Sequence, residues 1–313
     1  MGKSTREAFG EALLALGEGR SEIVVLDADL SKSTMTQAFL KKFPERHFEF
    51  GIAEANMIGA GAGLALCGKI PFATSFACFL VGRLETIRVA AAYNQANIKL
   101  VGTHAGLGIG EDGASQMGLE DVAAMRSLPN VVVLQPADAL ETRQAVEWMA
   151  AHKGPVYLRL TRQKLEDCHA PDYRFEPGRA DVVWEPAPSP PHYQATIFAS
   201  GGTVGGAIAA AKDLLSRKFN ARVVNACTLK PFDDDSVERF SRDSGRFVAV
   251  EDHNIIGGLG TAVCEAAALR GLGVPVVKLG VRAFGESGSP EELYEKHGLS
   301  APHIVEAALR NLS

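Results

Sequence analysis

One carboxylate and two aromatic rings stand out in the first third of the chain. Glu54 lies in FEFGIAEANM (48–57), at the start of a predicted helix rich in glycine and alanine. Its carboxylate can serve a site, or it can only complement the positive end of the helix macrodipole. Phe76 and Phe79, in TSFACF (74–79), are spaced to line one face of a helix or turn. They can form a binding surface or ordinary core.

A glycine-rich loop holds the densest group of polar side chains. The segment GTHAGLGIGEDGASQ (102–116) follows a predicted strand and surrounds one histidine, two carboxylates and one glutamine with glycines. Loops at the carboxyl ends of parallel strands are where α/β sheets bind ligands, and glycine lets the backbone approach a ligand closely. The segment therefore predicts a ligand-binding loop, with a purely structural loop as the alternative.

Alternating strands and helices position these three segments. Apolar, β-branched runs predict buried strands at 22–26, 71–75, 98–101, 131–134 and 156–160. Apolar residues at helical spacing predict helices at 5–16, 55–66, 84–92 and 139–151. The alternation predicts an α/β domain over residues 1–166, with a mainly parallel sheet and helices on both faces.

A second, smaller α/β domain is predicted over residues 194–313. Six prolines between positions 171 and 191 exclude a continuous helix, so residues 167–193 are predicted to be a linker. Beyond it we expect strands at 195–199, 222–225, 247–251 and 274–279, and helices at 207–215 and 259–269. The glycines at 201, 202, 205 and 206 lack the basic residue of a Walker loop, so they predict a tight strand-to-helix turn.

The composition is that of a soluble globular chain. The 313 residues are 46% hydrophobic and 22% charged, and a formal net charge of -5 argues against a nucleic-acid-binding protein. The five cysteines have no metal-ligand spacing and are expected to be free thiols. Because the first residues are polar and no apolar run reaches membrane-spanning length, we expect a cytoplasmic protein that does not bind membranes.

The three segments together, in this order, resemble the transketolase family over essentially the whole chain. The likeness extends to STREAFG (4–10), DADLSKST (27–34), RSLPN (126–130), LTR (160–162), LKPFD (229–233) and EDH (251–253). GEDG followed by SQ is specific to the family, whereas GIAE followed by Asn is shared more widely among thiamine diphosphate enzymes. The resemblance implies a pyrimidine-binding domain followed by a transketolase C-terminal domain.

The diphosphate-binding domain of full-length members has no counterpart in this sequence. Its signature, Gly-Asp-Gly followed later by an Asn, does not occur here. The resemblance implies that a separate N-terminal transketolase subunit supplies that domain and holds a divalent metal (Mg or Ca), while this chain binds no metal itself. It also implies self-association of this chain in a heterotetramer, and a place in the pentose phosphate pathway.

The resemblance assigns roles toward thiamine diphosphate. Glu54 matches the catalytic glutamate that hydrogen-bonds the aminopyrimidine ring nitrogen, so it must hold or share a proton near neutral pH and must be buried. Phe76 and Phe79 match the aromatics that pack on that ring. Asp29 matches an acidic residue close to the cofactor. Gln116 stands where some members have His and is expected to hydrogen-bond the cofactor or the donor sugar.

A second set of residues is matched to the sugar phosphates. Arg6, Ser33, His104 and Arg162 match the phosphate-binding residues of the family, and guanidinium groups suit bidentate contacts to phosphate. His104 is also expected to act in catalysis. Asp112 matches the carboxylate that recognises the substrate hydroxyls and their stereochemistry.

The implied activity is transfer of a two-carbon ketol unit from a ketose phosphate to an aldose phosphate, in an active site shared with the N-terminal subunit. A specialised transketolase for an unusual pentose or sulfosugar is one alternative. The β subunit of a 2-oxoacid dehydrogenase is another, but the GEDG segment and the phosphate set speak against it. A decayed assembly subunit is disfavoured by the joint presence of the motif residues. The sugar pair, and the effects of Gln116 and of Gly82, which replaces an aromatic, are left open.

Overall fold

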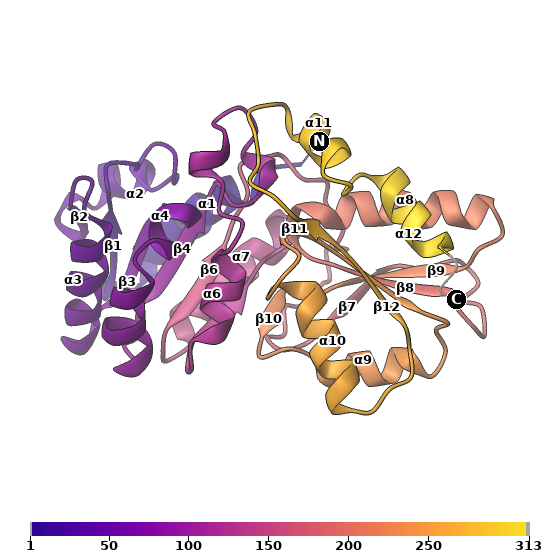
Figure 1. The fold of residues 1–313 in the computed structure, drawn as a ribbon. Helices are drawn as coiled ribbons and strands as arrows, with labels where there is room; N and C mark the ends of the chain where they lie inside the picture. Colours follow the sequence, from indigo (N-terminus) through magenta and orange to yellow (C-terminus); the bar gives the residue numbers. More distant parts are fainter. Residues whose placement is uncertain (1, 311–313) are drawn as a thin grey trace.

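Two sheets lie side by side, the first in the left half of Figure 1 and the second in the right half. The computed structural model describes residues 2–310. The first sheet has seven strands, in the order β10 (Thr228–Lys230), β5 (Val132–Leu134), β6 (Val156–Arg159), β4 (Lys99–Thr103), β3 (Ile70–Phe76), β1 (Ile23–Asp27) and β2 (His47–Glu49). The second has five, in the order β12 (Val276–Val281), β11 (Phe247–Asn254), β8 (Ala195–Ala199), β9 (Ala221–Asn225) and β7 (Asp181–Trp184).

Each sheet is parallel except for one edge strand. β10 pairs antiparallel with β5, and β7 pairs antiparallel with β9. The other pairings in both sheets are parallel. The predicted class, two α/β domains with mainly parallel sheets, is confirmed.

Helices cover both faces of the two sheets. In the first domain they are α1 (Thr5–Gly19), α2 (Gln37–Lys42), η1 (Pro44–Arg46), α3 (Glu54–Leu66), α4 (Ala77–Val81), α5 (Leu84–Thr86), η2 (Ile87–Tyr93), η3 (Leu107–Ile109), η4 (Ala114–Gln116), α6 (Asp121–Ser127) and α7 (Ala139–Ala151). In the second they are η5 (Gly201–Thr203), α8 (Val204–Ser216), α9 (Asp234–Ser241), α10 (Leu259–Leu269), α11 (Pro290–Lys296) and α12 (Ala301–Leu309). Figure 1 shows α8 and α12 on one side of the second sheet and α9 and α10 on the other.

Strand β1 illustrates why apolar runs form the centre of the first sheet. All five of its residues are buried, because helices lie against both faces of the sheet. Successive side chains point to opposite faces. Val25 therefore belongs to the same hydrophobic cluster as Leu13 of α1, whereas Leu26 belongs to the cluster that contains Met57 of α3.

Helix α1 begins at a capping box that the sequence supplies. The Ser4 hydroxyl accepts a hydrogen bond from the Glu7 N–H, and the Glu7 carboxylate accepts one from the Ser4 N–H. The Thr5 hydroxyl accepts the N–H of Thr161 at 2.8 Å. The first turn of α1, which carries Arg6, is therefore fixed against the segment that follows β6.

The structure differs from the predicted elements in several places. Strand β7 falls inside residues 167–193, where prolines exclude a helix but still allow a short edge strand. Strand β10 follows β9 in the chain but joins the first sheet, so a segment of the predicted second domain adds an edge to the first. The helix predicted at 84–92 is divided into α5 and the π-helical η2. The short elements α2, β2, α9, α11 and α12 were also not predicted.

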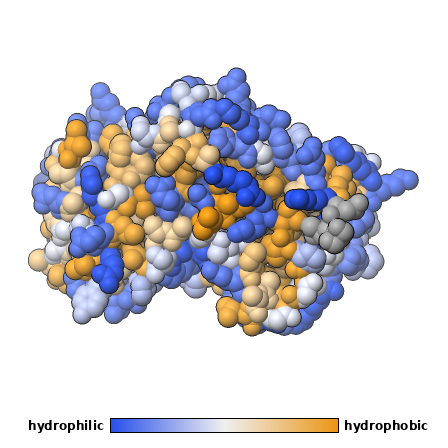
Figure 2. All heavy atoms as spheres, in the orientation of Figure 1, coloured by the Kyte–Doolittle hydropathy of each residue, from blue (hydrophilic) through white to orange (hydrophobic). Residues whose placement is uncertain are grey.

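The surface mixes polar and apolar residues. Figure 2 shows apolar atoms grouped between the two domains and over the α10 side of the second domain, among many hydrophilic ones. None of the helices in residues 2–310 combines the length and apolar character that crossing a membrane requires. All five cysteines are free thiols, as expected.

Candidate active site

The predicted site residues gather where four neighbouring strands of the first sheet end. β1, β3, β4 and β6 are adjacent and parallel, so the segments after them meet at one edge of the sheet. Those segments carry Asp29, Ser33, Phe76, Phe79, His104 and Arg162.

Glu54 is the first residue of α3 and is only 3% exposed. The Ser75 hydroxyl, near the end of β3, donates a hydrogen bond to Glu54 Oε1 at 3.3 Å. This is the one hydrogen bond to the Glu54 carboxylate within residues 2–310. A buried carboxyl group with unused hydrogen-bonding capacity can bind a polar nitrogen that a ligand brings. Glu54 is thus buried, as its predicted role requires, while the role itself stays a prediction.

Three aromatic rings stack where β3 and β4 end. The rings of Phe76 and Phe79 are nearly parallel, with centroids 5.5 Å apart and an interplanar angle of 8°. The Phe76 ring also stacks on the His104 imidazole, with centroids 3.8 Å apart. Phe76 is buried and Phe79 half-buried, so Phe79 offers part of its ring to a partner. Helix η4, which ends at Gln116, packs against the α4 segment that carries Phe79.

The hydrogen bonds of His104 define its protonation. Arg6 Nη1 lies 3.0 Å from His104 Nε2, and a guanidinium can only donate, so Nε2 carries no proton. His104 Nδ1 therefore donates to the Thr103 hydroxyl at 2.9 Å. Burial, reinforced by the charges of Arg6 and Arg162, lowers the pKa of His104 to about 3. The imidazole is neutral at physiological pH and is suited to hydrogen bonding, not to taking up a proton.

Two guanidinium groups face the same region. Arg6 Nη1 donates to the main-chain oxygen of Ser33 at 2.9 Å. Arg162 Nη1 donates to the Ile109 carbonyl at 2.9 Å and to Asp112 Oδ1 at 3.1 Å. Burial, followed by the charge of Arg162, lowers the pKa of Arg6. In the described part of the chain, the buried Arg6 Nε has no partner. Two nearby like charges and an unused donor favour binding of an anion.

Asp29 lies on the loop after β1 and is exposed, with φ of 60°. The loop is anchored by Asp27, which the sequence analysis did not single out. The buried Asp27 carboxylate accepts hydrogen bonds from three threonine hydroxyls, those of Thr34, Thr36 and Thr74. The exposed Asp29 carboxylate thus sits on a fixed loop.

Ser75 and Thr103 join the two parts of the site, and the sequence analysis missed both. The Thr103 hydroxyl contacts His104 and donates to the Ser75 carbonyl at 3.4 Å, while the Ser75 hydroxyl contacts Glu54. A continuous path therefore runs from Glu54 to His104 and Arg6. The signal available in the sequence was a small hydroxyl residue beside each motif residue at a strand end.

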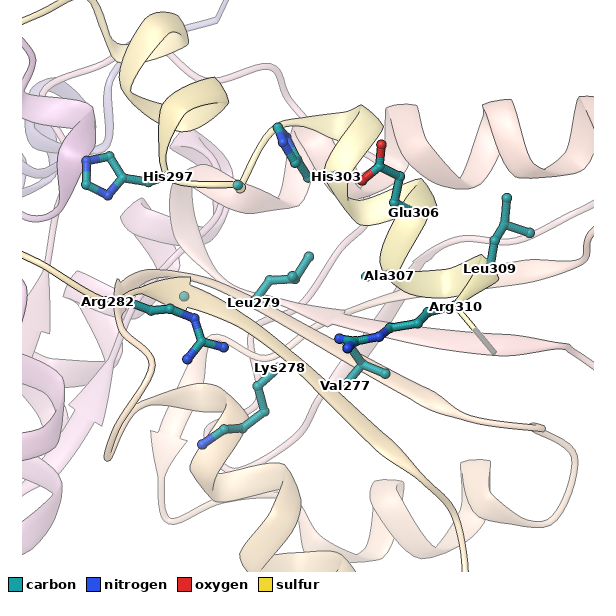
Figure 3. Close-up of a pocket in the computed structure, with 12 residues that line it drawn as sticks. Val277, Lys278, Leu279, Arg282, His297, His303, Glu306, Ala307, Leu309 and Arg310 are labelled. Carbon is teal, nitrogen blue, oxygen red and sulfur yellow. The ribbon is translucent and has the colours of Figure 1, made fainter. Parts of the chain in front are cut away.

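A separate cavity of ≈ 630 Å³ lies between β12 and α12 of the second domain (Figure 3). Charged residues of both signs line it, including Arg282, Glu306 and Arg310. The Lys278 ammonium donates to the Ile255 carbonyl at 2.9 Å, and Figure 3 shows the charged side chains leaving the cavity wall in different directions. Polar groups do not converge in this cavity as they do at the strand ends.

The residues at the strand ends fit the aminopyrimidine half of thiamine diphosphate. Glu54 supplies a buried carboxyl group with spare hydrogen-bonding capacity, and Phe79 supplies a partly open, flat apolar face. Glu54 is hydrogen-bonded to Ser75, the residue before Phe76, and Phe79 stacks on the Phe76 ring.

Comparison with known proteins finds two family models along the chain. The family model of the transketolase pyrimidine-binding domain matches residues 1–167, and that of the transketolase C-terminal domain matches residues 189–304. The chain is 45% identical, with a TM-score of 0.88, to a solved structure described as a split-gene transketolase in an inactive β4 tetramer. That match covers 99% of this chain and 98% of the other.

Three relatives of different length match nearly the whole chain. A Methanocaldococcus jannaschii protein, whose name assigns it provisionally to the C-terminal section of transketolase, is 42% identical over 99% of this chain and 96% of its own length. A 6-deoxy-6-sulfo-D-fructose transketolase subunit of Clostridium sp. is 38% identical over 97% of this chain and 92% of its own length. Human transketolase is 38% identical over 97% of this chain, which spans only 48% of the human protein. The chain therefore belongs to the transketolase family, and it carries the pyrimidine-binding and C-terminal domains of that family.

Proposed function

We propose that this chain is one subunit of a split transketolase. Together with a second polypeptide it transfers a two-carbon ketol unit from a ketose phosphate to an aldose phosphate. The observation that carries the proposal is the path from Glu54 through Ser75 and Thr103 to His104 and Arg6. It joins the proposed pyrimidine site to the proposed anion site, and both lie at the edge of the sheet where the parallel strands end.

Glu54 has the acid–base role in this proposal. Bound thiamine diphosphate supplies the carbanion chemistry of the transfer. Glu54 holds or shares a proton at the aminopyrimidine ring nitrogen, and its burial strengthens that hydrogen bond by excluding water. Phe76 and Phe79 orient the ring by packing against it. The exposed Asp29 and the half-buried Gln116 are assigned to the edge of the same site.

The part of the site formed by Arg6, His104, Arg162 and Asp112, here called the anion end, binds the sugar phosphate. Arg6 and Arg162 donate charge-assisted hydrogen bonds to it, and the unpartnered Arg6 Nε supports this assignment. His104 positions the Arg6 guanidinium through Nε2, and its pKa of about 3 makes it a poor proton acceptor. Asp112 recognises substrate hydroxyls. The Ser33 hydroxyl is assigned to the phosphate, while the Ser33 main-chain oxygen positions Arg6.

The assembly is proposed to contain a second kind of subunit. A separate N-terminal subunit is assigned the diphosphate and its divalent metal (Mg or Ca), by likeness to a split-gene transketolase and to a transketolase subunit of Clostridium sp.. Likeness to a β4 tetramer supports self-association of this chain. We propose a heterotetramer with two subunits of each kind, acting in the cytoplasm on pentose phosphates.

A sulfosugar is the second candidate substrate. The Clostridium relative at 38% identity is named for 6-deoxy-6-sulfo-D-fructose. A sulfonate, like a phosphate, presents several oxygens to guanidinium donors, so Arg6 and Arg162 suit either anion.

Reconstitution tests the proposal. The purified chain is mixed with the polypeptide that carries the Gly-Asp-Gly and Asn segment, thiamine diphosphate and Mg²⁺. We expect the mixture, and neither polypeptide alone, to convert xylulose 5-phosphate and ribose 5-phosphate. Conversion by this chain alone would refute the shared site. Activity only when 6-deoxy-6-sulfofructose is the donor would select the second candidate.

A further inference from the structure

Asp252 belongs to the second domain, but its side chain binds the loop that carries His104. It lies on β11 and is 1% exposed. Its Oδ1 accepts the Leu107 N–H at 2.7 Å, and its Oδ2 accepts the Gly108 N–H at 3.1 Å. These are the first N–H groups of η3, which have no acceptor inside the helix. A carboxylate from another domain therefore caps the helix that follows His104.

The loop is shaped to receive this carboxylate. The residue that precedes η3 is Gly106, which has φ of 78° and no side chain to cap the helix. A Cβ atom at Gly106 would lie 2.1 Å from Asp252 Oδ2. Both the backbone conformation and the space require glycine here, so the loop lacks a cap of its own and Asp252 takes that place.

A second connection reaches the other end of η3. The Tyr294 hydroxyl donates to Asp252 Oδ2 at 2.8 Å and accepts from Gln163 Nε2 at 2.8 Å. Gln163 directly follows Arg162, whose guanidinium donates to the carbonyl of Ile109, the last residue of η3. Asp252 therefore fixes the start of η3, Arg162 fixes its end, and Tyr294 links the two anchors.

The second domain holds the loop at one more point. The Ser287 hydroxyl donates to the Glu111 carbonyl at 2.6 Å, immediately before Asp112. On β11 itself, the Asp252 carbonyl accepts a hydrogen bond from the buried Arg159 guanidinium at 2.9 Å. The position of the loop is thus set by contacts from both domains.

We propose that Asp252 is a positioning residue for the transfer reaction, an inference that rests on the function proposed above. Asp252 acts by fixing η3. His104, before that helix, then lies beside the arginines that bind the anion, and Asp112, after it, faces the substrate hydroxyls. On this proposal the second domain does more than support the fold, because it sets the geometry of the substrate loop.

The neighbouring residue Glu251 provides a matched control. It is 2% exposed, and its carboxylate also accepts two main-chain N–H groups, those of Leu259 at 2.6 Å and Gly260 at 2.9 Å. Those groups belong to α10 of the second domain. Asp252→Asn and Glu251→Gln therefore each remove one buried carboxylate from the same strand, and they differ in the helix that is affected.

Steady-state kinetics of the assembled enzyme test the role in the reaction. For Asp252→Asn we expect KM for phosphorylated sugars to rise about tenfold, with a smaller change in kcat, because misplaced binding groups weaken substrate contacts. Tyr294→Phe should shift KM in the same direction by a smaller factor. Proton exchange at C2 of the cofactor, which depends on Glu54, should keep the wild-type rate. A wild-type KM in Asp252→Asn, or an equal rise in Glu251→Gln, would overturn the proposal.

Amide hydrogen exchange of the chain gives a test that is independent of activity. The amides of Leu107 and Gly108 should exchange at least about tenfold faster in Asp252→Asn than in the wild type or in Glu251→Gln, since a lost hydrogen bond exposes them to water. Unchanged exchange would overturn the proposal. If the assembled wild type shows no ketol transfer, the proposed function fails, and the exchange rates still decide whether Asp252 orders the loop.

Discussion

The anion end and the cofactor end of the site differ in how far this chain completes them. At the anion end, Arg6, His104, Arg162 and Asp112 all contact other residues of the chain. At the cofactor end, Glu54 has one hydrogen bond of 3.3 Å and Asp29 is exposed. The comparison indicates that the chain organises its anion-binding groups in advance. It leaves Glu54 and Asp29 with hydrogen-bonding capacity for the cofactor.

A buried ion pair, through its contacts, holds the segments that carry the anion end. Arg159 and Asp121 form a salt bridge of 2.8 Å, with side chains 1% and 0% exposed. Arg159 Nη2 also donates to the carbonyls of Gly118 and Asp252, which tie the substrate loop to β11. The buried Arg159 charge is stabilised by its pairing with Asp121, because water cannot solvate it there. The contacts that hold the substrate loop therefore depend on Asp121.

The largest effect, on the free energy of unfolding, is expected from removing Asp121, the partner of Arg159. Asp121→Ala leaves the Arg159 charge buried and unpaired, which should lower the free energy of unfolding by about 3–5 kcal/mol. Chemical denaturation of the isolated chain measures this loss. The control is Glu265→Ala, which removes the exposed partner of Arg126 and should cost less than about 1 kcal/mol. Equal losses in the two variants would mean that the anion end is not held more firmly than the surface.

A smaller effect is expected from His104, through pH. Its folded-state pKa of about 3 lies below the ordinary 6.5, so the unfolded chain binds the proton more readily. Stability from this group is complete above pH 6.5 and is lost as pH falls toward 3. At pH 4 the loss should reach about 3 kcal/mol.

His104→Asn should remove this dependence, because Asn does not titrate and tolerates the positive φ of this position. Denaturation curves of the wild type and of His104→Asn at pH 7 and pH 4 provide the measurement. The stability difference between the two proteins should shift in favour of the variant at low pH. A difference independent of pH would show that His104 is not held neutral by the folded anion end.

The smallest effect is expected on substrate affinity. Arg162→Ala removes one charge-assisted contact, so KM for phosphorylated acceptors should rise about tenfold while KM for unphosphorylated acceptors stays nearly constant. Arg179→Ala, which removes an exposed arginine paired with Glu176, is the control and should change neither. A similar rise in KM for phosphorylated and unphosphorylated acceptors would show that Arg162 does not bind the phosphate, and that the anion end has no separate role.

The sequence predicted the elements that depend on local pattern. Buried strands such as β1 and helices such as α1 were predicted because apolar runs and the helical spacing of apolar residues are local signals. Strand β10 was not, because its three residues are a strand only in contact with β5, which is distant in the chain. Strand β7 was hidden by prolines that an edge strand tolerates.

In the candidate site, too, some residues could be identified from the sequence and others could not. Arg6, Glu54, His104 and Arg162 were singled out through family likeness, and the fold brings them to one edge. Asp252 was given no role in the site, because nothing in EDH (251–253) indicates that the middle residue binds a loop about 145 positions earlier. Such cross-domain contacts have no local signal.

The most direct test of the shared active site is the rate of proton exchange at C2 of thiamine diphosphate in the reconstituted enzyme. Glu54→Gln should slow this exchange by about a hundredfold or more, within the range of acid–base groups. The isolated variant should unfold at the same denaturant concentration as the wild type, since Gln keeps the size of Glu54 and an oxygen that can accept the Ser75 hydroxyl. Exchange at the wild-type rate in Glu54→Gln would contradict the role of Glu54, and with it the proposal that this chain supplies the pyrimidine half of the active site.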